Sequence, residues 1–81
     1  MGRIIKGIND KELNRLVKNL ARNVQRERAK QGLTMQSLAT LAQMATSTVF
    51  EIENGKVEDF RMSTITALAQ RLGVDPLELL K

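Results

Sequence analysis

The chain has 81 residues, a formal net charge of +4, and neither cysteine nor histidine. A chain of this length folds as one small domain, and without cysteine it has no disulfide or thiolate metal site to reinforce it. Without histidine it lacks the commonest general base and metal ligand, and its carboxylates and lysines show no paired spacing. We therefore expect no enzyme, no metal site and no cofactor.

The distribution of residue types favours a cytoplasmic, all-helical domain. Leu, Ala, Gln, Lys, Arg and Met are abundant, while there is one proline and the only aromatic residues are two phenylalanines. No apolar run is long enough to span a membrane, and the N-terminus lacks the apolar core of a signal peptide. The charge is uneven, with nine Lys/Arg and three Asp/Glu in residues 1–31 but one Lys and four Asp/Glu in residues 32–60. This is not the pattern of a uniformly basic nucleic-acid coat.

The first predicted elements are an arm, residues 1–8, and an extended first helix that ends before Gly32. Asn9 or Asp10 can cap this helix, and Glu12 follows Asn9 by three residues as in a capping box. One apolar stripe at helical spacing runs along it, formed by Leu13, Leu16, Val17, Leu20, Ala21 and Val24.

The remaining chain predicts four shorter helices. Thr34 can cap a second helix, with Met35, Leu38, Ala39 and Ala42 inward, and a third begins near Ala45 or Thr46, with Val49 and Ile52 inward. A fourth carries Met62, Ile65, Leu68, Ala69 and Leu72 and ends at Gly73. The last helix has Asp75 as N-cap, Pro76 at its first position and Glu78 at its third.

Two charges fall on inward-facing positions of these helices. Arg28 is the next residue on the stripe of the first helix, and Glu53 lies four residues after Val49 on the third. A charge on a core-facing position needs a partner, so a salt bridge between Arg28 and Glu53 is predicted. The alternative is that both are solvated charges at helix ends.

The second and third helices, residues 34–54, have the layout of a helix-turn-helix. Val49 and Ile52 would dock the third helix and leave its outer face free for the major groove of DNA. That outer face consists of Thr46, Ser47, Phe50, Glu51 and Asn54.

The sequence resembles the phage-repressor and Cro type of helix-turn-helix family, often called XRE, over about residues 20–80. The resemblance rests on "GLT", "SLA", "STV", "IENG" and "LAQRLGVDPLELL", at family spacing apart from one extra residue after Gly55. It implies a five-helix, lambda-repressor-like DNA-binding domain that is usually a dimer on a two-fold symmetric operator. It also implies an internal salt bridge at the positions of Arg28 and Glu53.

Carried over by position, the resemblance implies two sets of DNA contacts. Thr46, Ser47 and Glu51 would read base edges with Phe50 beside them, and Thr34, Asn54 and Lys56 would approach phosphates. The sequence departs from the family pattern in three places. Met35 stands where a phosphate-contacting glutamine is common, and Gln43 stands at a turn position where glycine is usual. Ala45 replaces the usual capping Ser or Thr, so Thr46 is an alternative cap that would shift the reading register by one residue.

The positive charge lies mainly outside this motif. Arg22 and Arg26 on the first helix and Arg3 and Lys6 on the arm are candidate contacts to the DNA backbone or, for the arm, the minor groove. A solvated arm without a role in binding is the alternative for Arg3 and Lys6.

Several apolar residues exceed what a small core needs. Phe50 has three interpretations: a base contact, an anchor for a protein partner, or a side chain packed on Phe60. Leu41 is a second apolar residue at an exposed position. Leu77, Leu79 and Leu80 predict a dimer interface at the C-terminal end, with docking inside the monomer as the alternative.

The sequence therefore predicts a dimeric, sequence-specific transcriptional regulator that binds double-stranded DNA, and more specifically a repressor, from a prokaryote or a phage. The first alternative is the antitoxin of a toxin–antitoxin pair, which would use the same fold for DNA and a further surface for the toxin. The second is a helix-turn-helix domain used only for protein contacts. Salt-dependent affinity for DNA separates the last interpretation from the other two.

Overall fold

The structure, a computed structural model, describes residues 10–56 and 61–81. The predicted arm, Asn9 of the predicted capping box, and Phe60 lie outside these residues. Within them the chain forms α1 (Asp10–Lys30), α2 (Met35–Leu41), α3 (Thr46–Glu53), α4 (Met62–Leu72) and a short 3₁₀ helix, η1 (Pro76–Leu80). This part of the molecule is all-helical, as predicted.

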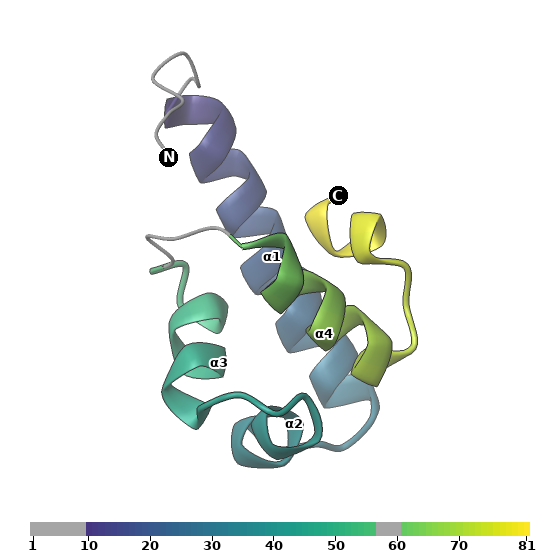
Figure 1. Ribbon diagram of the computed structural model, residues 1–81. Coiled ribbons are helices and arrows are strands. Elements are labelled where there is room, and N and C mark those ends of the chain that lie inside the picture. The colour runs from purple at the N-terminus through teal and green to yellow at the C-terminus, as the bar shows by residue number, and fades with distance from the viewer. Residues whose placement is uncertain (1–9, 57–60) are drawn as a thin grey trace.

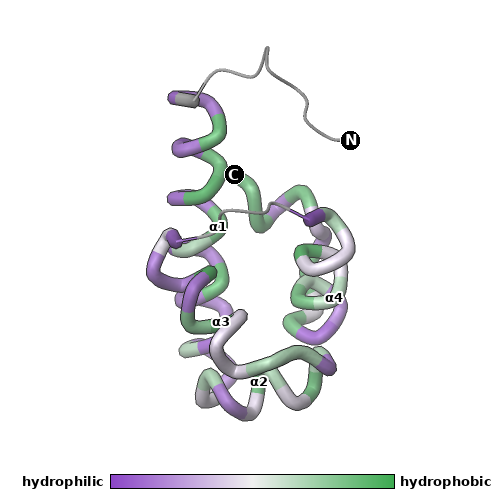
Figure 2. The backbone as a smooth tube through the Cα atoms, turned by 60° about the vertical axis from the view of Figure 1, so that its left-hand side comes forward, coloured by the Kyte–Doolittle hydropathy of each residue, from purple (hydrophilic) through white to green (hydrophobic). Residues whose placement is uncertain are grey.

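The long helix α1 is the support on which the other elements pack. Val17, Leu20 and Val24 of its apolar stripe are buried, and in Figure 2 hydrophilic and apolar stretches alternate along this helix. Leu13 and Leu16, nearer its start, are only partly buried, because the first turns of α1 project beyond the other helices (Figure 1). The apolar stripe therefore serves the core along its second half.

One core joins all five elements. α2, α3, α4 and η1 each contribute fully buried aliphatic side chains, and α1 closes the cluster from one side. The largest side chains with almost no exposed surface are Leu20, Leu38, Ile65, Leu68, Leu79, Val24 and Val49. Burial of one such side chain contributes about 1.5–3 kcal/mol, which is why a domain this small holds together without covalent reinforcement.

The predicted helix ends are confirmed at two glycines and two caps. Gly32 and Gly73 have positive φ angles of 68° and 75°, the left-handed conformation in which glycine avoids a Cβ clash. Thr34 accepts a hydrogen bond from the Ser37 N–H at 2.9 Å, and Asp75 accepts one from the Leu77 N–H at 2.8 Å. These side chains satisfy N–H groups that the first turns leave without helical partners.

The last element differs from the prediction in its type. Pro76–Leu80 is a five-residue 3₁₀ helix rather than a fifth α-helix. So short a segment makes few i to i−4 bonds, and its carbonyls are instead taken by α1. The Asn19 side chain donates to the Leu80 carbonyl at 2.9 Å, and the Asn23 side chain donates to the Glu78 and Leu79 carbonyls at 3.2 and 2.9 Å.

This anchoring corrects the predicted dimer interface of Leu77, Leu79 and Leu80. Leu79 is 1% exposed and belongs to the core, and Leu80 is partly buried against that core. Of the three leucines only Leu77, at 62% exposed, lies on the surface. The prediction is therefore wrong for Leu79, because its side chain packs in the core of the monomer itself.

Candidate nucleic-acid interface

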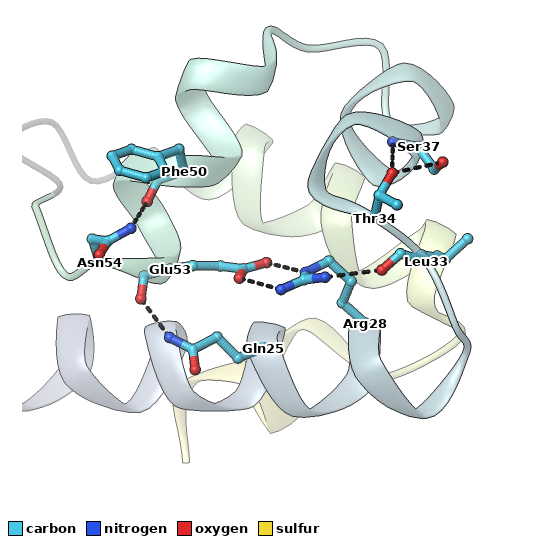
Figure 3. A network of polar contacts seen from close by, with 8 residues as sticks. All are labelled: Gln25, Arg28, Leu33, Thr34, Ser37, Phe50, Glu53 and Asn54. Carbon is cyan, nitrogen blue, oxygen red and sulfur yellow. Dashed lines mark hydrogen bonds and ion pairs between the residues drawn. The ribbon is translucent and has the colours of Figure 1, made fainter.

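The inner face of α3 is fixed by apolar packing and by a buried ion pair. Val49 is 0% and Ile52 3% exposed, and the Glu53 side chain, on the same face, is 2% exposed. Arg28 of α1 donates to both carboxylate oxygens, from Nε to Oε2 at 2.6 Å and from Nη2 to Oε1 at 2.9 Å. The structure thus brings together the two charges whose pairing the helical spacing predicts (Figure 3).

Arg28 also connects α3 to the start of the motif. Its Nη1 donates to the Leu33 carbonyl at 2.9 Å, just before the cap of α2. The hydrogen bonds to Glu53, and then the attraction of its charge, raise the pKa of Arg28, although burial opposes them. A bidentate pair of this kind sets the orientation of α3 relative to α1 and α2 as well as holding it in place.

A second contact, from Gln25, joins α1 to the end of α3. The Gln25 side-chain amide donates to the Glu53 carbonyl at 2.6 Å (Figure 3). In the same way the Gln31 amide donates to the Leu72 carbonyl at 2.7 Å, at the end of α4. Sequence reasoning missed both, because an exposed glutamine on a helix gives no signal of a distant carbonyl partner.

In the turn between α2 and α3 a residue other than glycine adopts the left-handed backbone conformation, which is energetically unfavourable for it. Gln43 has φ 58°, the left-handed region, at the position where glycine is usual in the family that the sequence resembles. That conformation costs a residue with a Cβ about 1–2 kcal/mol. Two backbone bonds hold the turn, from Gln43 N to Thr40 O at 3.1 Å and from Met44 N to Ala39 O at 2.9 Å. Met44 packs on the core beside them.

The reading register of α3 is set by its docking and not by a cap side chain. Ala45 is the N-cap residue and makes no side-chain hydrogen bond, and the helix begins at Thr46. The alternative in which Thr46 caps the helix and shifts the register is therefore wrong. Since Val49 and Ile52 must face the core, the packing keeps Thr46 as the first helical residue even though no side chain caps the helix.

The outer face of α3 presents the predicted base-reading residues together. All four residues are exposed: Thr46, Ser47, Phe50 and Glu51. Phe50, taken as a whole residue, is 50% exposed. The helix contains no lysine or arginine. Asn54, the residue after it, donates from its side-chain amide to the Phe50 carbonyl at 2.7 Å (Figure 3). The outer face is therefore an uncharged strip apart from Glu51.

The predicted phosphate-contacting residues differ in whether their polar groups already make hydrogen bonds within the protein. The Thr34 hydroxyl accepts the capping bond of α2 and donates to the Ser37 hydroxyl at 2.9 Å. Met35 is half-buried against the core, which explains why an apolar residue replaces the glutamine common in the family. Lys56 is exposed directly after α3.

Two of the predicted phosphate-contacting cations, Arg22 and Arg26, are exposed on α1. Arg22, one helical turn before Gln25, is exposed and donates to the Asn19 side chain at 3.3 Å. The Arg26 side chain is 55% exposed, with Nε 3.9 Å from a Glu27 oxygen. Ion pairs as exposed as this contribute little, so both guanidinium groups are accessible to a phosphate. Arg3 and Lys6 of the predicted arm lie outside the described residues.

Other kinds of site are not found in residues 10–56 and 61–81. These residues contain no group of three or more Asp or Glu side chains placed to hold a metal ion. No helix among them is both long and apolar enough to cross a membrane. Every buried polar side-chain atom in this part of the chain has a hydrogen-bond partner.

Comparison with known proteins identifies the same motif. Residues 24–79 match the family HTH_3, described as helix-turn-helix. A hypothetical transcription factor from Neisseria, NHTF, is 27% identical, with a TM-score of 0.77 over 82% of this chain and 75% of that one. The restriction-modification controller protein C.AhdI from Aeromonas hydrophila is 27% identical, with a TM-score of 0.72 over 78% of this chain and 94% of that one.

A third structure supports the fold alone. An HTH_3 family transcriptional regulator from Vibrio cholerae is 18% identical, with a TM-score of 0.74 over 82% of this chain and 36% of that one. No curated protein matches the chain. Because the HTH_3 match spans more than half of the sequence and includes both helices of the motif and the Arg28–Glu53 pair, this chain belongs to the HTH_3 family of helix-turn-helix DNA-binding transcriptional regulators.

Proposed function

We propose that this protein is a sequence-specific transcriptional regulator that binds a two-fold symmetric DNA operator as a homodimer and represses transcription. One observation carries the proposal. α3 is held rigidly by its inner face, while the whole of its outer face is exposed. A short helix presented in this way fits the major groove of B-DNA, where each base pair shows its own pattern of donors and acceptors.

In this proposal the outer face of α3 supplies specificity. The hydroxyls of Thr46 and Ser47 donate to or accept from base edges, and the Glu51 carboxylate accepts a hydrogen bond from an amino group such as cytosine N4. Phe50 lies beside them and contributes apolar contact. Since Glu51 is repelled by the phosphates, it disfavours sequences that offer no amino group to it.

Affinity comes mainly from groups outside α3. Lys56, Arg22 and Arg26, together with Arg3 and Lys6 of the arm, are the proposed partners of phosphates. Thr34 and Asn54 contribute polar contacts at the two ends of the motif. If affinity and specificity come from different residues in this way, a basic protein can bind DNA although α3 itself carries no lysine or arginine.

The surface of η1 supports dimerisation, and the likeness to a controller protein supports a regulatory role. C.AhdI, a controller protein, is matched over 94% of its length. Leu77 is the exposed leucine that the C-terminal surface offers to a second copy, whereas Leu80 is partly buried against the core. A repressor of this size acts by occupying its operator in the cytoplasm of a prokaryotic or phage-infected cell.

The test is selection of binding sites from randomised DNA duplexes. The affinity of the protein for the selected sequences is then measured at a series of salt concentrations. We expect an enriched palindrome whose half-sites lie about one helical turn apart, and weaker binding by Ser47→Ala on that palindrome, by about 1–3 kcal/mol. The matched control is Ser63→Ala, an exposed serine on α4. Failure to enrich any sequence, with weak binding that modest salt abolishes, would overturn the proposal.

A second candidate function is that of an antitoxin, which binds DNA through the same motif and a toxin through another surface. The observation that favours it is the exposure of two large apolar residues within the motif, Phe50 at 50% on α3 and Leu41 at 46% on α2, of which Leu41 lies outside the proposed base-reading face. Aromatic side chains such as that of Phe50 are enriched in protein interfaces. If DNA selection fails, these two residues become the first candidates for a protein interface, whether with a toxin or in a module used for protein contacts alone.

A further inference from the structure

The outer face of α3 is divided into two rows of different chemistry. Ser47 and Glu51, four residues apart, form a polar row of hydrogen-bonding groups. Thr46, Phe50 and Asn54, also four apart, form the neighbouring row. In the second row the Asn54 amide already donates to the Phe50 carbonyl at 2.7 Å, so a donor of this row is engaged with the helix itself.

The second row is apolar at its middle position, between the hydroxyl of Thr46 and the amide of Asn54. Its centre is the Phe50 ring, and the Thr46 side chain carries a methyl group one turn before it. Figure 3 shows Phe50 and Asn54 next to each other on α3, with the Arg28–Glu53 pair lying toward α1. A phenyl ring has no donor or acceptor, so it recognises a base only through an apolar group.

The major groove offers one such group, the methyl carbon at position 5 of thymine. Cytosine carries a methyl at the same ring position when it is methylated there, and uracil is thymine without it. At the same time α3 has no lysine or arginine, the residues that make the commonest specific contact, to guanine. The helix thus lacks the commonest reader of guanine and presents a ring suited to a methyl group and a carboxylate suited to an amino group.

From this we infer that Phe50 reads a pyrimidine 5-methyl group, so that the protein distinguishes thymine from uracil and 5-methylcytosine from cytosine at one position of each half-site. This inference rests on the proposed function, since it requires α3 to lie in the major groove. It extends that function to sensitivity toward the methylation of cytosine.

The expected size of the effect follows from the burial of one methyl group. Removing a methyl from contact with Phe50 weakens binding about fourfold per half-site, the equivalent of ~0.8 kcal/mol when 1.4 kcal/mol is tenfold. A dimer on a symmetric operator meets the change twice, which gives about fifteenfold. The dependence of affinity on salt stays the same, because no phosphate contact is altered.

The experiment uses the operator obtained by selection and the full chain. Thymines are replaced by uracil one position at a time, symmetrically in both half-sites, and the dissociation constants are measured by fluorescence anisotropy at one salt concentration. At the sensitive position a C·G pair is then compared with its 5-methylated form. We expect uracil to weaken binding about fifteenfold at one position, and methylation of cytosine there to strengthen it by a similar factor.

Two variants show whether Phe50 is responsible. In Phe50→Ala both effects should shrink to less than twofold, since the ring that contacts the methyl is gone. Leu41→Ala, which removes an equally exposed apolar side chain from α2, should keep them at full size. Both positions are on the surface, so both variants should unfold at nearly the wild-type urea concentration, which circular dichroism checks.

The outcomes separate this inference from the proposed function. If an operator is enriched but uracil and 5-methylcytosine make no difference at any position, the methyl inference is wrong and the DNA-binding function stands. The inference is equally wrong if Phe50→Ala keeps the full methyl effect. If no operator is enriched, both fail, and Phe50 is not a reader of bases.

Discussion

The two faces of α3 differ in how completely their chemistry is satisfied inside the protein. On the inner face Val49 and Ile52 are buried, and Glu53 has both carboxylate oxygens bonded to Arg28. On the outer face Ser47, Phe50 and Glu51 are exposed. The side chains of the inner face make their contacts within the monomer, whereas those of the outer face are accessible to a binding partner.

This difference indicates that stability and specificity reside on separate residues of one eight-residue helix. Substitutions on the inner face should change the free energy of unfolding, and substitutions on the outer face should change which DNA is bound. Such separation allows the outer face to vary without loss of the fold, provided that Arg28 and Glu53 are kept.

The largest expected effect comes from breaking the pair on the inner face. Arg28→Met leaves the Glu53 carboxylate buried without its partner, and we expect a loss of about 3–5 kcal/mol in the free energy of unfolding. Urea unfolding followed by circular dichroism measures it. A loss below about 1 kcal/mol would show that α3 does not depend on the pair for its docking.

Arg28→Lys is the matched control, because it keeps the charge but not the two-pronged geometry, and it should fall between wild type and Arg28→Met. The pH dependence has a definite sign. Since the pKa of Arg28 is raised in the folded state, its stabilisation is fully present below the ordinary arginine pKa and is lost only as pH rises through the raised value. The difference between wild type and Arg28→Met should therefore stay constant from pH 7 to about pH 10.

A smaller effect is expected at the boundary between the two faces, where α3 begins. Ala45 is the N-cap residue without a capping side chain. Ala45→Ser should add a hydrogen bond to a free N–H of the first turn and raise the free energy of unfolding by about 1 kcal/mol. Thr34→Ala, which removes the existing cap of α2, should lower it by a similar amount. An unchanged urea midpoint for Ala45→Ser would mean that the N–H groups of this first turn are already satisfied.

The smallest effect on stability belongs to the outer face. Glu51→Gln should change the free energy of unfolding by no more than about 0.5 kcal/mol, because the side chain is exposed. Its effect should appear in DNA recognition, as a broader set of selected operator sequences, since the amide no longer repels phosphates at mismatched sites. If Glu51→Gln unfolds the protein as readily as an inner-face substitution, the separation of the two faces is wrong.

The sequence was sufficient to predict those features that a single helix encodes. Stripes at helical spacing predicted α1 to α4, glycines predicted two helix ends, and the coincidence of two charges on inward positions predicted the Arg28–Glu53 pair. Each of these follows from which residues share one side of a helix. The grouping of Thr46, Ser47, Phe50 and Glu51 on one exposed face has the same origin.

What the sequence left open depends on contacts between distant segments. Whether the three leucines of residues 77–80 face a partner or the core depends on how η1 packs on α1 and α4. Asn19 and Asn23, which are ordinary polar helix residues in the sequence, take part in that packing through hydrogen bonds to η1. The start of α3 is likewise decided by how deeply Val49 docks and not by the preference of Ala45 or Thr46 for a cap position. Local rules cannot supply these choices, because the deciding group lies elsewhere in the chain.

The anchoring of η1 to α1 also has a consequence for how the protein is made. The carbonyl partners of Asn19 and Asn23 lie as far as 61 and 56 residues further along the chain, so they leave the ribosome after the entire helix-turn-helix motif. At about 5–20 residues per second, the 25 residues from Asn54 to Leu79 take on the order of 1–5 s to synthesise, and until then Leu79 is absent from the core. During that interval the nascent chain exposes apolar core surface beside a complete reading helix. A chaperone or a protease can bind the chain in this state. The core is complete only when the segment after Gly73, which forms η1, packs on α1.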